Sequence, residues 1–205
     1  MALTGQFSSG VDLTAANLNA SSIPVVSSTA DIVTPFVGQI IFSTTDNRLY
    51  RYNGSAWIIF INGPTWQIRR NASMNLTSTT FTAITFDTDD NDTGNLHDPV
   101  TNSDRVTIAQ AGLFALSAKG SWSTHATGTR YIDITLNGTI IPGSSNRVSA
   151  LATPDVTACA TPTLYQQCLV GDILRVREWH NAGTTLTTAT SSADQPLFTG
   201  AWLHD

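Results

Sequence analysis

The feature that most constrains the fold of this chain is a series of short runs whose pattern repeats at every second residue, with tight-turn residues between them. The clearest case is "LYQQCLVGDILRVREWH", residues 164–180, where two such runs meet at Val170-Gly171-Asp172. Successive side chains of a β-strand point to opposite faces, so a period of two is typical of a strand. A glycine between the runs supplies the backbone freedom that a tight turn needs. The pattern predicts antiparallel strands.

Composition supports the same fold class. Lys119 is the only lysine, Glu178 is the only glutamate, and charged residues make up 12% of the chain. Lys and Glu favour helices, whereas Thr, Val and Ile favour strands and Asp, Asn and Gly favour turns. We therefore predict an all-β protein with a polar surface that carries few charges.

The first two segments of the chain have little capacity for a core. Residues 1–33 show no sustained period, so we expect an extended arm, with a short helix over residues 11–18 as the alternative. Residues 34–62 are expected to form a small β-meander, in which Asn53-Gly54 is a strong hairpin signal. So small a sheet is expected to need a second layer or neighbouring subunits. Its expected strands are 39–43, 48–52 and 56–61.

The third segment, residues 66–205, follows a Gly-Pro break and shows no helical pattern. Short strands at regular spacing, with Gly, Asn and Asp between them, are typical of a sandwich or barrel. The expected strands are 66–70, 80–86, 105–109, 112–122, 129–136, 139–141, 163–169, 173–180, 184–189 and 196–203.

Four motifs follow one another in this third segment. They are an acidic loop and Asp-Pro turn leading into a strand (84–122), the hairpin "RYIDITLNGTII", the paired runs of residues 163–180, and the closing "PLFTGAWLHD". Their order resembles the jelly-roll domain of the complement globular-head and tumour necrosis factor superfamily. The resemblance implies an antiparallel jelly-roll sandwich that forms a homotrimer through apolar, aromatic-rich inner faces. It also implies that the ends of the domain lie together at its base, with loops at the far end. The trimer-interface candidates are Trp122, Tyr131, Phe198 and Trp202.

A second resemblance concerns the meander. "GQIIFSTTDNRLYRYNGSAW", residues 38–57, is similar to a small module that recurs in bacteriophage tail fibres and other virion appendages. With no secretion-signal pattern at the start, this implies a non-enzymatic virion protein made in the host cytoplasm, a trimeric tail-fibre or tail-tip (minor tail) component. Residues 1–61 would attach it to other virion proteins. The alternative is a capsid (head) decoration protein that stabilises the shell as a trimer. The particle-attachment candidates are Phe7, Leu13, Leu18 and Phe36.

Residues 84–100 are rich in aspartate and raise the question of a calcium site. An EF-hand register that starts at Asp89 puts Val100 at the twelfth position, where a bidentate glutamate is required. We therefore favour a solvated turn whose Asp and Asn side chains bond to the local backbone. A looser calcium site with Asp87, Asp89 and Asp92 as ligands is the alternative, and no other cofactor is expected.

Catalytic motifs are missing from the sequence. It contains no nucleophile elbow and no zinc-protease motif, so we assign no catalytic residues. A glycan-cleaving enzyme that uses a pair of aspartates is a third hypothesis.

Polar loops at the far end of the jelly roll are the expected sites of recognition, because rigid β scaffolds place binding residues on loops. His125 and Arg147 are the first candidates for contacts with a host cell-surface glycan or protein. A net charge of −5 without a basic cluster argues against nucleic acid, and no long apolar run predicts membrane insertion. Cys159 and Cys168 are expected to be buried thiols, with a hairpin disulfide as the alternative.

Overall fold

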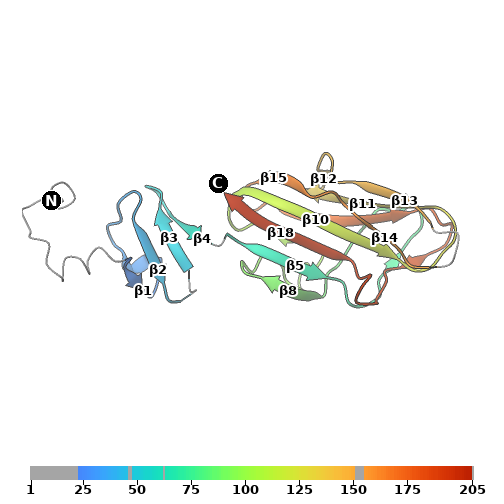
Figure 1. The fold of residues 1–205 in the computed structure, drawn as a ribbon, viewed down its shortest axis with the longest axis horizontal. Helices are drawn as coiled ribbons and strands as arrows, with labels where there is room; N and C mark the ends of the chain where they lie inside the picture. The colour runs from blue at the N-terminus through green and yellow to red at the C-terminus, as the bar shows by residue number, and fades with distance from the viewer. Residues whose placement is uncertain (1–22, 46–47, 62, 151–154, 205) are drawn as a thin grey trace, which may run out of the picture. The chain divides into compact units, whose positions relative to one another are not determined.

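The structure is a computed structural model that describes residues 23–45, 48–61, 63–150 and 155–204. The chain forms two compact units that divide between residues 62 and 63. Unit 1 is residues 1–62 and unit 2 is residues 63–205. Almost every regular element of the described residues is a β-strand (Figure 1), so the all-β prediction is confirmed.

Unit 1 is a four-stranded sheet with strand order β1-β2-β3-β4. The three predicted strands are found within a residue of their expected bounds. The segment before them differs from the prediction, because Val25 and Val26 pair in parallel with Phe42 and Ser43 instead of lying in a free arm. The alternative of a short helix over residues 11–18, and the first 22 residues of the expected arm, lie outside the described residues. The elements are β1 (Val25–Val26), a 3-10 turn (Thr29–Asp31), β2 (Ile40–Ser43), β3 (Arg48–Tyr52) and β4 (Trp57–Ile61).

The turn between β3 and β4 shows why the sequence folds as a hairpin here. The side-chain oxygen of Asn53 accepts hydrogen bonds from the backbone amides of Ser55 (3.0 Å) and Ala56 (2.8 Å). Gly54 has a φ of 106°, which a residue with a Cβ rarely adopts. An asparagine followed by a glycine therefore satisfies both the hydrogen bonds and the backbone geometry of this turn.

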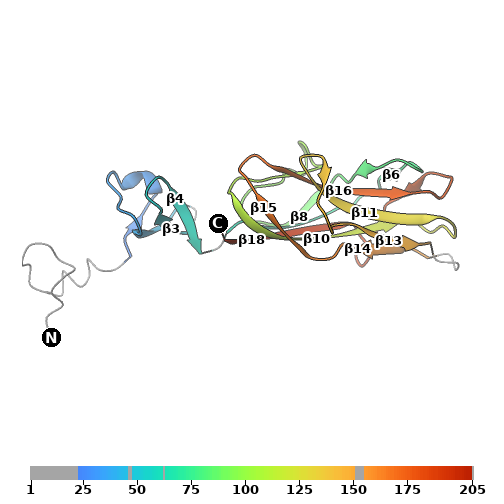
Figure 2. The ribbon, with the colours of Figure 1, turned by 90° about the horizontal axis from the view of Figure 1, so that it is seen from above.

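Unit 2 is built from two sheets of antiparallel strands (Figures 1 and 2). The β10 sheet has the order β14-β10-β18-β5-β8, and β15 also pairs with β10. The β11 sheet has the order β12-β11-β16-β7, and β13 and β9 pair with β11 and β16. A small separate sheet joins β6 and β17. The strands are β5 (Thr65–Arg69), β6 (Asn75–Leu76), β7 (Thr82–Ala83), β8 (Thr88–Asp92), β9 (Val106–Thr107), β10 (Gly112–Trp122), β11 (Thr129–Leu136), β12 (Thr139–Ile140), β13 (Asn146–Ser149), β14 (Thr157–Ala160), β15 (Leu164–Cys168), β16 (Ile173–His180), β17 (Leu186–Thr187) and β18 (Leu197–His204).

The core of unit 2 is formed by the alternate residues that the two sheets turn toward each other. Phe114 and Leu116 on β10 and Ile132 and Ile134 on β11 are fully buried. Burial alternates along β10 from Gly112 to Gly120, whereas on β11 Asp133 and Thr135 of the opposite face are buried as well. Each apolar side chain of the core contributes about 1.5–3 kcal/mol when it is removed from water. The period-two pattern of the sequence therefore marks the layer between the sheets.

The acidic segment is the main departure from the predicted strands. Thr88–Asp92 forms β8, an edge strand of the β10 sheet, where a solvated turn was expected. Before it, only Thr82–Ala83 of the expected strand 80–86 is a strand. The sequence "TDDND" gives no sign of alternation because most of its side chains are exposed, and charged side chains on an edge strand also discourage pairing with another chain.

The two ends of unit 2 lie together, as the jelly-roll resemblance implied. The amide of Trp202 on β18 donates to the carbonyl of Pro64, just before β5, at 3.0 Å. The connections at residues 123–128 and 181–185 lie at the opposite end, where β10, β11 and β16 finish or begin. Unit 2 therefore has a base that carries both termini and a far end that carries loops.

Candidate binding surfaces

The solvent-facing side of the β10 sheet is made of small residues. Ala115 and Ser117 on β10 lie beside Ala201 and Thr199 on β18, and together with Thr163 they line a shallow hollow of about 220 Å³. At the margins of this face, Tyr165 is 68% exposed and Leu203 is 43% exposed. Small side chains let another protein surface approach the sheet closely. We call this side of the β10 sheet the small-residue face.

Two predicted trimer-interface residues belong to the core instead. The side chains of Trp122 and Phe198 are 0% and 1% exposed within a single chain, so neither is available to a neighbouring subunit. The sequence placed both residues on strands but did not show whether their side chains point into the core or toward solvent, because adjacent positions on a strand point to opposite faces. The prediction for these two residues is wrong.

The other two predicted interface residues remain partly exposed. Trp202 lies at the base, where its indole nitrogen donates to the carbonyl of Ala111 at 3.0 Å. Tyr131 lies on the β11 sheet and faces solvent, on the opposite side of the sandwich from the small-residue face. A subunit that packed on the small-residue face would therefore leave Tyr131 uncovered by that contact.

The outer side of the β11 sheet carries a row of aromatic rings that sequence analysis did not bring together. Strand register places Trp179 on β16 opposite Tyr131 on β11, and Tyr131 opposite Arg147 on β13. These strands lie side by side in Figure 2. Phe81, just before β7, completes the row: its ring centroid is 5.5 Å from that of Tyr131 and 6.2 Å from that of Trp179. We call Phe81, Trp179, Tyr131 and Arg147 the aromatic row.

Two guanidinium groups stack on this row. The guanidinium carbon of Arg147 lies 5.3 Å from the ring centroid of Tyr131, and that of Arg177 lies 4.7 Å from the centroid of Phe81. Arg177 also donates from Nε and Nη2 to the two carboxylate oxygens of Asp133, at 2.9 and 2.8 Å. These hydrogen bonds raise the pKa of Arg177, and Asp133 itself is fully buried. Both guanidinium groups are thus held over aromatic rings. Each exposed cation–π contact of this kind contributes about 0.5–1 kcal/mol of stabilisation.

His125 and Arg147, the predicted receptor contacts, lie on different elements. His125 is in the loop after β10, and its Nδ1 lies 3.3 Å from the amide nitrogen of Thr127. The loop is held from inside by Arg130, whose Nη1 and Nη2 donate to the carbonyls of Thr127 and His125, each at 3.0 Å. Burial lowers the pKa of Arg130. A buried cation that binds loop carbonyls gives this far-end loop a defined shape.

Asp87, the first calcium-ligand candidate, is occupied by protein partners. It accepts hydrogen bonds from the amides of Asn71 (2.7 Å) and Ala72 (2.9 Å) and lies 3.5 Å from Arg70. Burial acts to raise the pKa of Asp87, but these hydrogen bonds outweigh it and leave the pKa below its ordinary value. Asp87 therefore caps the turn after β5.

Asp89 and Asp92 also bind protein groups, and both contact His97. Asp89 Oδ1 lies 2.6 Å from His97 Nδ1, while Asp92 accepts from the amides of His97 (2.9 Å) and Gly94 (3.2 Å). The second ring nitrogen of His97 faces the carbonyl of Ser103 at 3.2 Å. A histidine engaged on both sides has no nitrogen left to activate a nucleophile. Within the described ranges, no three His, Cys, Asp or Glu side chains are grouped so as to hold a metal ion.

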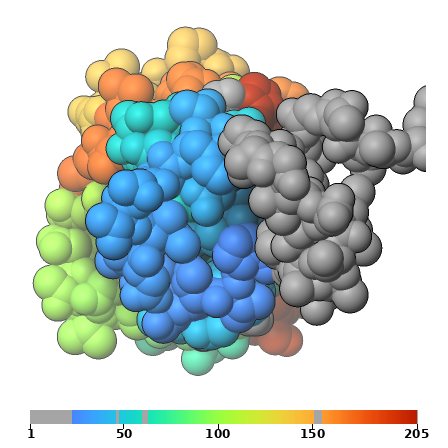
Figure 3. Space-filling view, turned by 90° about the vertical axis from the view of Figure 1, so that its left-hand side faces the viewer, coloured from blue at the N-terminus to red at the C-terminus, as the bar shows by residue number. Residues whose placement is uncertain are grey.

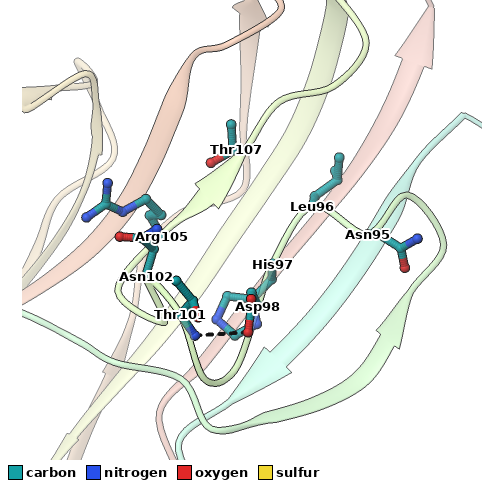
Figure 4. Close-up of a pocket in the computed structure, with 8 residues that line it drawn as sticks. All are labelled: Asn95, Leu96, His97, Asp98, Thr101, Asn102, Arg105 and Thr107. Carbon is teal, nitrogen blue, oxygen red and sulfur yellow. Dashed lines mark hydrogen bonds between the residues drawn. The ribbon is translucent and has the colours of Figure 1, made fainter.

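This histidine is one of the residues that line a surface hollow of about 210 Å³. Figure 4 shows the lining residues. Asp98 shapes the floor of the hollow by accepting hydrogen bonds from the amides of Val100 and Thr101, each at 2.9 Å. These amide bonds lower the pKa of Asp98. The charged and ring groups of this hollow, those of His97, Asp98 and Arg105, are engaged by neighbouring protein groups, as in a structural turn. Its lining residues are Asn95, Leu96, His97, Asp98, Thr101, Asn102, Arg105 and Thr107.

Sequence analysis also missed a buried acid. Glu178 is fully buried between the sheets, its Oε1 accepts from the amide of Ser121 at 3.1 Å, and burial raises its pKa well above the ordinary value. The sequence does contain a signal for this burial, because Glu178 follows Leu174 and Val176 at every second position of β16 and so points to the same face of the sheet. A carboxyl in this environment is held in its neutral form.

Cys159 and Cys168 are both free and buried, so the thiol prediction is confirmed. They pair with Gly120 and Gly112, eight residues apart along β10, which corresponds to about 26 Å. A disulfide requires Cα atoms within about 7 Å. Burial raises the pKa of Cys159 to about 12 and that of Cys168 to about 11, so neither is a reactive thiolate near neutral pH.

The fold of unit 2 is shared with solved structures. Murine APRIL at pH 5.0 superposes with a TM-score of 0.52 and 13% sequence identity, over 68% of this chain and 98% of APRIL. An Eiger TNF from S. frugiperda gives a TM-score of 0.50 and 12% identity, over 69% of this chain and 92% of Eiger. Identity this low shows the fold alone. The jelly-roll prediction is confirmed, and unit 2 has a fold similar to that of these tumour-necrosis-factor-like domains.

Sequence comparisons add no family assignment. No family model matches the chain, and no curated protein matches it. A search of the described residues for a helix long and apolar enough to cross a membrane finds none.

Proposed function

We propose that this chain is a non-enzymatic structural protein of a bacteriophage virion, a trimeric tail-fibre or tail-tip component. In this proposal the N-terminal region attaches the protein to the particle, and the jelly roll faces the host surface. The proposal combines the tail-fibre resemblance of residues 38–57 with the tumour-necrosis-factor-like fold of unit 2.

The observation that carries the proposal is the small-residue face. Ala115 and Ala201 lie opposite each other at the centre of an otherwise well-packed sheet, with Tyr165 and Leu203 exposed at its margins. Exposed apolar side chains gathered on one face are typical of protein interaction sites. Three copies that packed through this face would cover those side chains and form the homotrimer.

Unit 1 supports attachment to a partner. Val33, Phe36 and Val37 are 88%, 67% and 71% exposed, and Val25 on the edge strand is 68% exposed. Figure 3 shows this part of the chain in blue. A unit that leaves such side chains in water gains stability when another protein covers them. Phe36 fits the predicted attachment role, whereas Phe7, Leu13 and Leu18 lie outside the described residues.

Electron microscopy of native particles with a gold-labelled antibody against residues 66–205 tests the location. Label at the tail end supports the proposal. Label spread over the head would favour the capsid decoration protein instead, and particles that lack the protein should then burst more readily on heating. Particles without label would refute a virion role of either kind.

A further inference from the structure

We propose that the aromatic row of the β11 sheet binds an acidic saccharide, with a sugar ring on Trp179 and a sugar carboxylate on Arg147. This inference rests on the proposed host-facing role of the jelly roll and names the chemical class of its ligand.

The row is a preformed platform. Its rings come from three different strand regions, and cross-strand pairing fixes Trp179 beside Tyr131 and Tyr131 beside Arg147. Phe81 is 47% exposed although it touches both other rings. Trp179, Tyr131 and Arg147 occupy paired positions on three neighbouring strands and extend over about 10 Å, two strand spacings. The Phe81 ring meets that of Tyr131 edge-on, at 84°, and is tilted by 33° against that of Trp179, so a ligand meets rings that already brace one another.

Trp179 is the ring best placed for stacking. Guanidinium groups lie over Tyr131 and Phe81, whereas among the residues that the structure describes none lies over the Trp179 ring. The electron-rich face of an indole attracts groups with partial positive charge, and it is also a large apolar surface. The C–H-bearing face of a pyranose ring offers both properties. Trp179 is therefore the contact for the sugar ring.

Arg147 supplies the charge that selects an acidic sugar. Its side chain is exposed, its guanidinium is held over Tyr131, and no ion pair to it occurs within the described ranges. Close to it, the Asp133 carboxylate is buried and already neutralised by Arg177. Arg147 is thus the cation of the aromatic row that is available to a ligand, on a chain whose net charge is −5. The planar guanidinium donates two parallel hydrogen bonds to a carboxylate, a geometry that a neutral sugar cannot use.

The size of the row favours a saccharide over a protein partner. An aromatic side chain buries about 150–250 Å² when it is fully covered. Three rings that are already partly covered fall short of the roughly 800 Å² per partner of a stable protein interface. A short stretch of polysaccharide can be bound through a contact area of this size, because many copies of the site on one particle bind the same polymer and raise the overall affinity.

Isothermal titration of the full chain with hexamers of galacturonate and of mannuronate tests the inference. We expect at least one of the two uronate hexamers to bind. The same hexamer with its carboxyl groups reduced to alcohols should bind at least about tenfold more weakly. Arg147→Ala and Trp179→Leu should each weaken binding by a similar factor. Arg51→Ala removes the same charge from an exposed position in unit 1 and should leave binding unchanged. Melting curves of each variant confirm that the fold is intact.

Three results would overturn the inference: no binding of either uronate, equal loss in the Arg147 and Arg51 variants, or equal binding of poly-L-glutamate. The last result would point to an acidic polypeptide partner. The titration uses purified protein and so is independent of particle labelling. A protein that binds the uronate but is missing from the virion would refute the proposed function and leave the site standing.

Discussion

The two units of this chain use the same kind of strand but differ in what their sheets cover. In unit 2, two sheets face each other, and residues such as Phe114 and Ile132 are removed from water. In unit 1, the described residues form a single sheet: among residues 23–45 and 48–59, Ile41 is the only fully buried apolar side chain. Unit 2 has a core that can stabilise it, whereas the described part of unit 1 buries little apolar surface of its own. This difference agrees with the proposal that unit 2 binds the host surface and that unit 1 attaches the protein to the particle.

Replacing Gly200 should have the largest effect, and only on unit 2. A Cβ at this position would lie inside the ring of Trp66, which is 2% exposed and packed against Phe114 and Phe198. Gly200→Val should therefore abolish the cooperative melting of the jelly roll, measured by near-ultraviolet circular dichroism. Thr139→Val introduces the same side chain at an exposed position on β12; it is the control and should melt like the parent. A Gly200→Val protein with unchanged melting would contradict the packing of this site.

One chemical change made in both units sharpens the comparison. Ile132→Ala removes a fully buried side chain from the jelly-roll core and should cost about 2–5 kcal/mol, lowering the main melting transition. Ile41→Ala makes the same change in unit 1 and should leave that transition where it is, because the units have separate cores. Differential scanning calorimetry measures both. Equal shifts of one shared transition would show that the two units unfold together.

Glu178→Gln should produce a smaller, pH-dependent effect. Burial raises the folded-state pKa of Glu178 above its ordinary value of 4.5, so the folded chain holds a proton that the unfolded chain releases. The parent therefore loses stability as the pH rises above about 4.5, and glutamine does not. We expect the variant to melt higher than the parent at pH 8 and close to it at pH 4. The same difference at both values would mean that the carboxyl does not titrate as its burial requires.

Calcium should have the smallest effect. Asp87, Asp89 and Asp92 already bind backbone amides, an arginine and a histidine. We expect millimolar calcium and excess chelator to give the same melting temperature, because a ligand of the folded state alone must raise stability. A rise on adding calcium, lost in Asp89→Asn but kept in Asp155→Asn, would establish a calcium site on β8.

The sequence predicted the long strands of unit 2 well and the short ones poorly. The bounds of β10, β11 and β16 match the expected ranges because strict alternation marks a strand with one face in the core. β8 was missed because most of its side chains are exposed, so its sequence does not alternate. β13 and β14 do alternate in burial but are only four residues long, and their sequences "NRVS" and "TACA" are too short to show a period. The candidate sites were harder, since a one-residue change of phase moves a side chain such as Trp122 between core and surface. The aromatic row joins residues 81, 131, 147 and 179, and only strand register brings these together.

The most direct test of the proposed assembly is the native mass of the purified full chain by light scattering, with Ala201→Arg beside it. The account predicts about three times the chain mass of 21.9 kDa for the parent. It predicts a single-chain mass for the variant, because an arginine at the centre of the small-residue face blocks close packing. A parent protein that scatters as one chain would contradict the trimer, and a variant that stays trimeric would move the interface to another face.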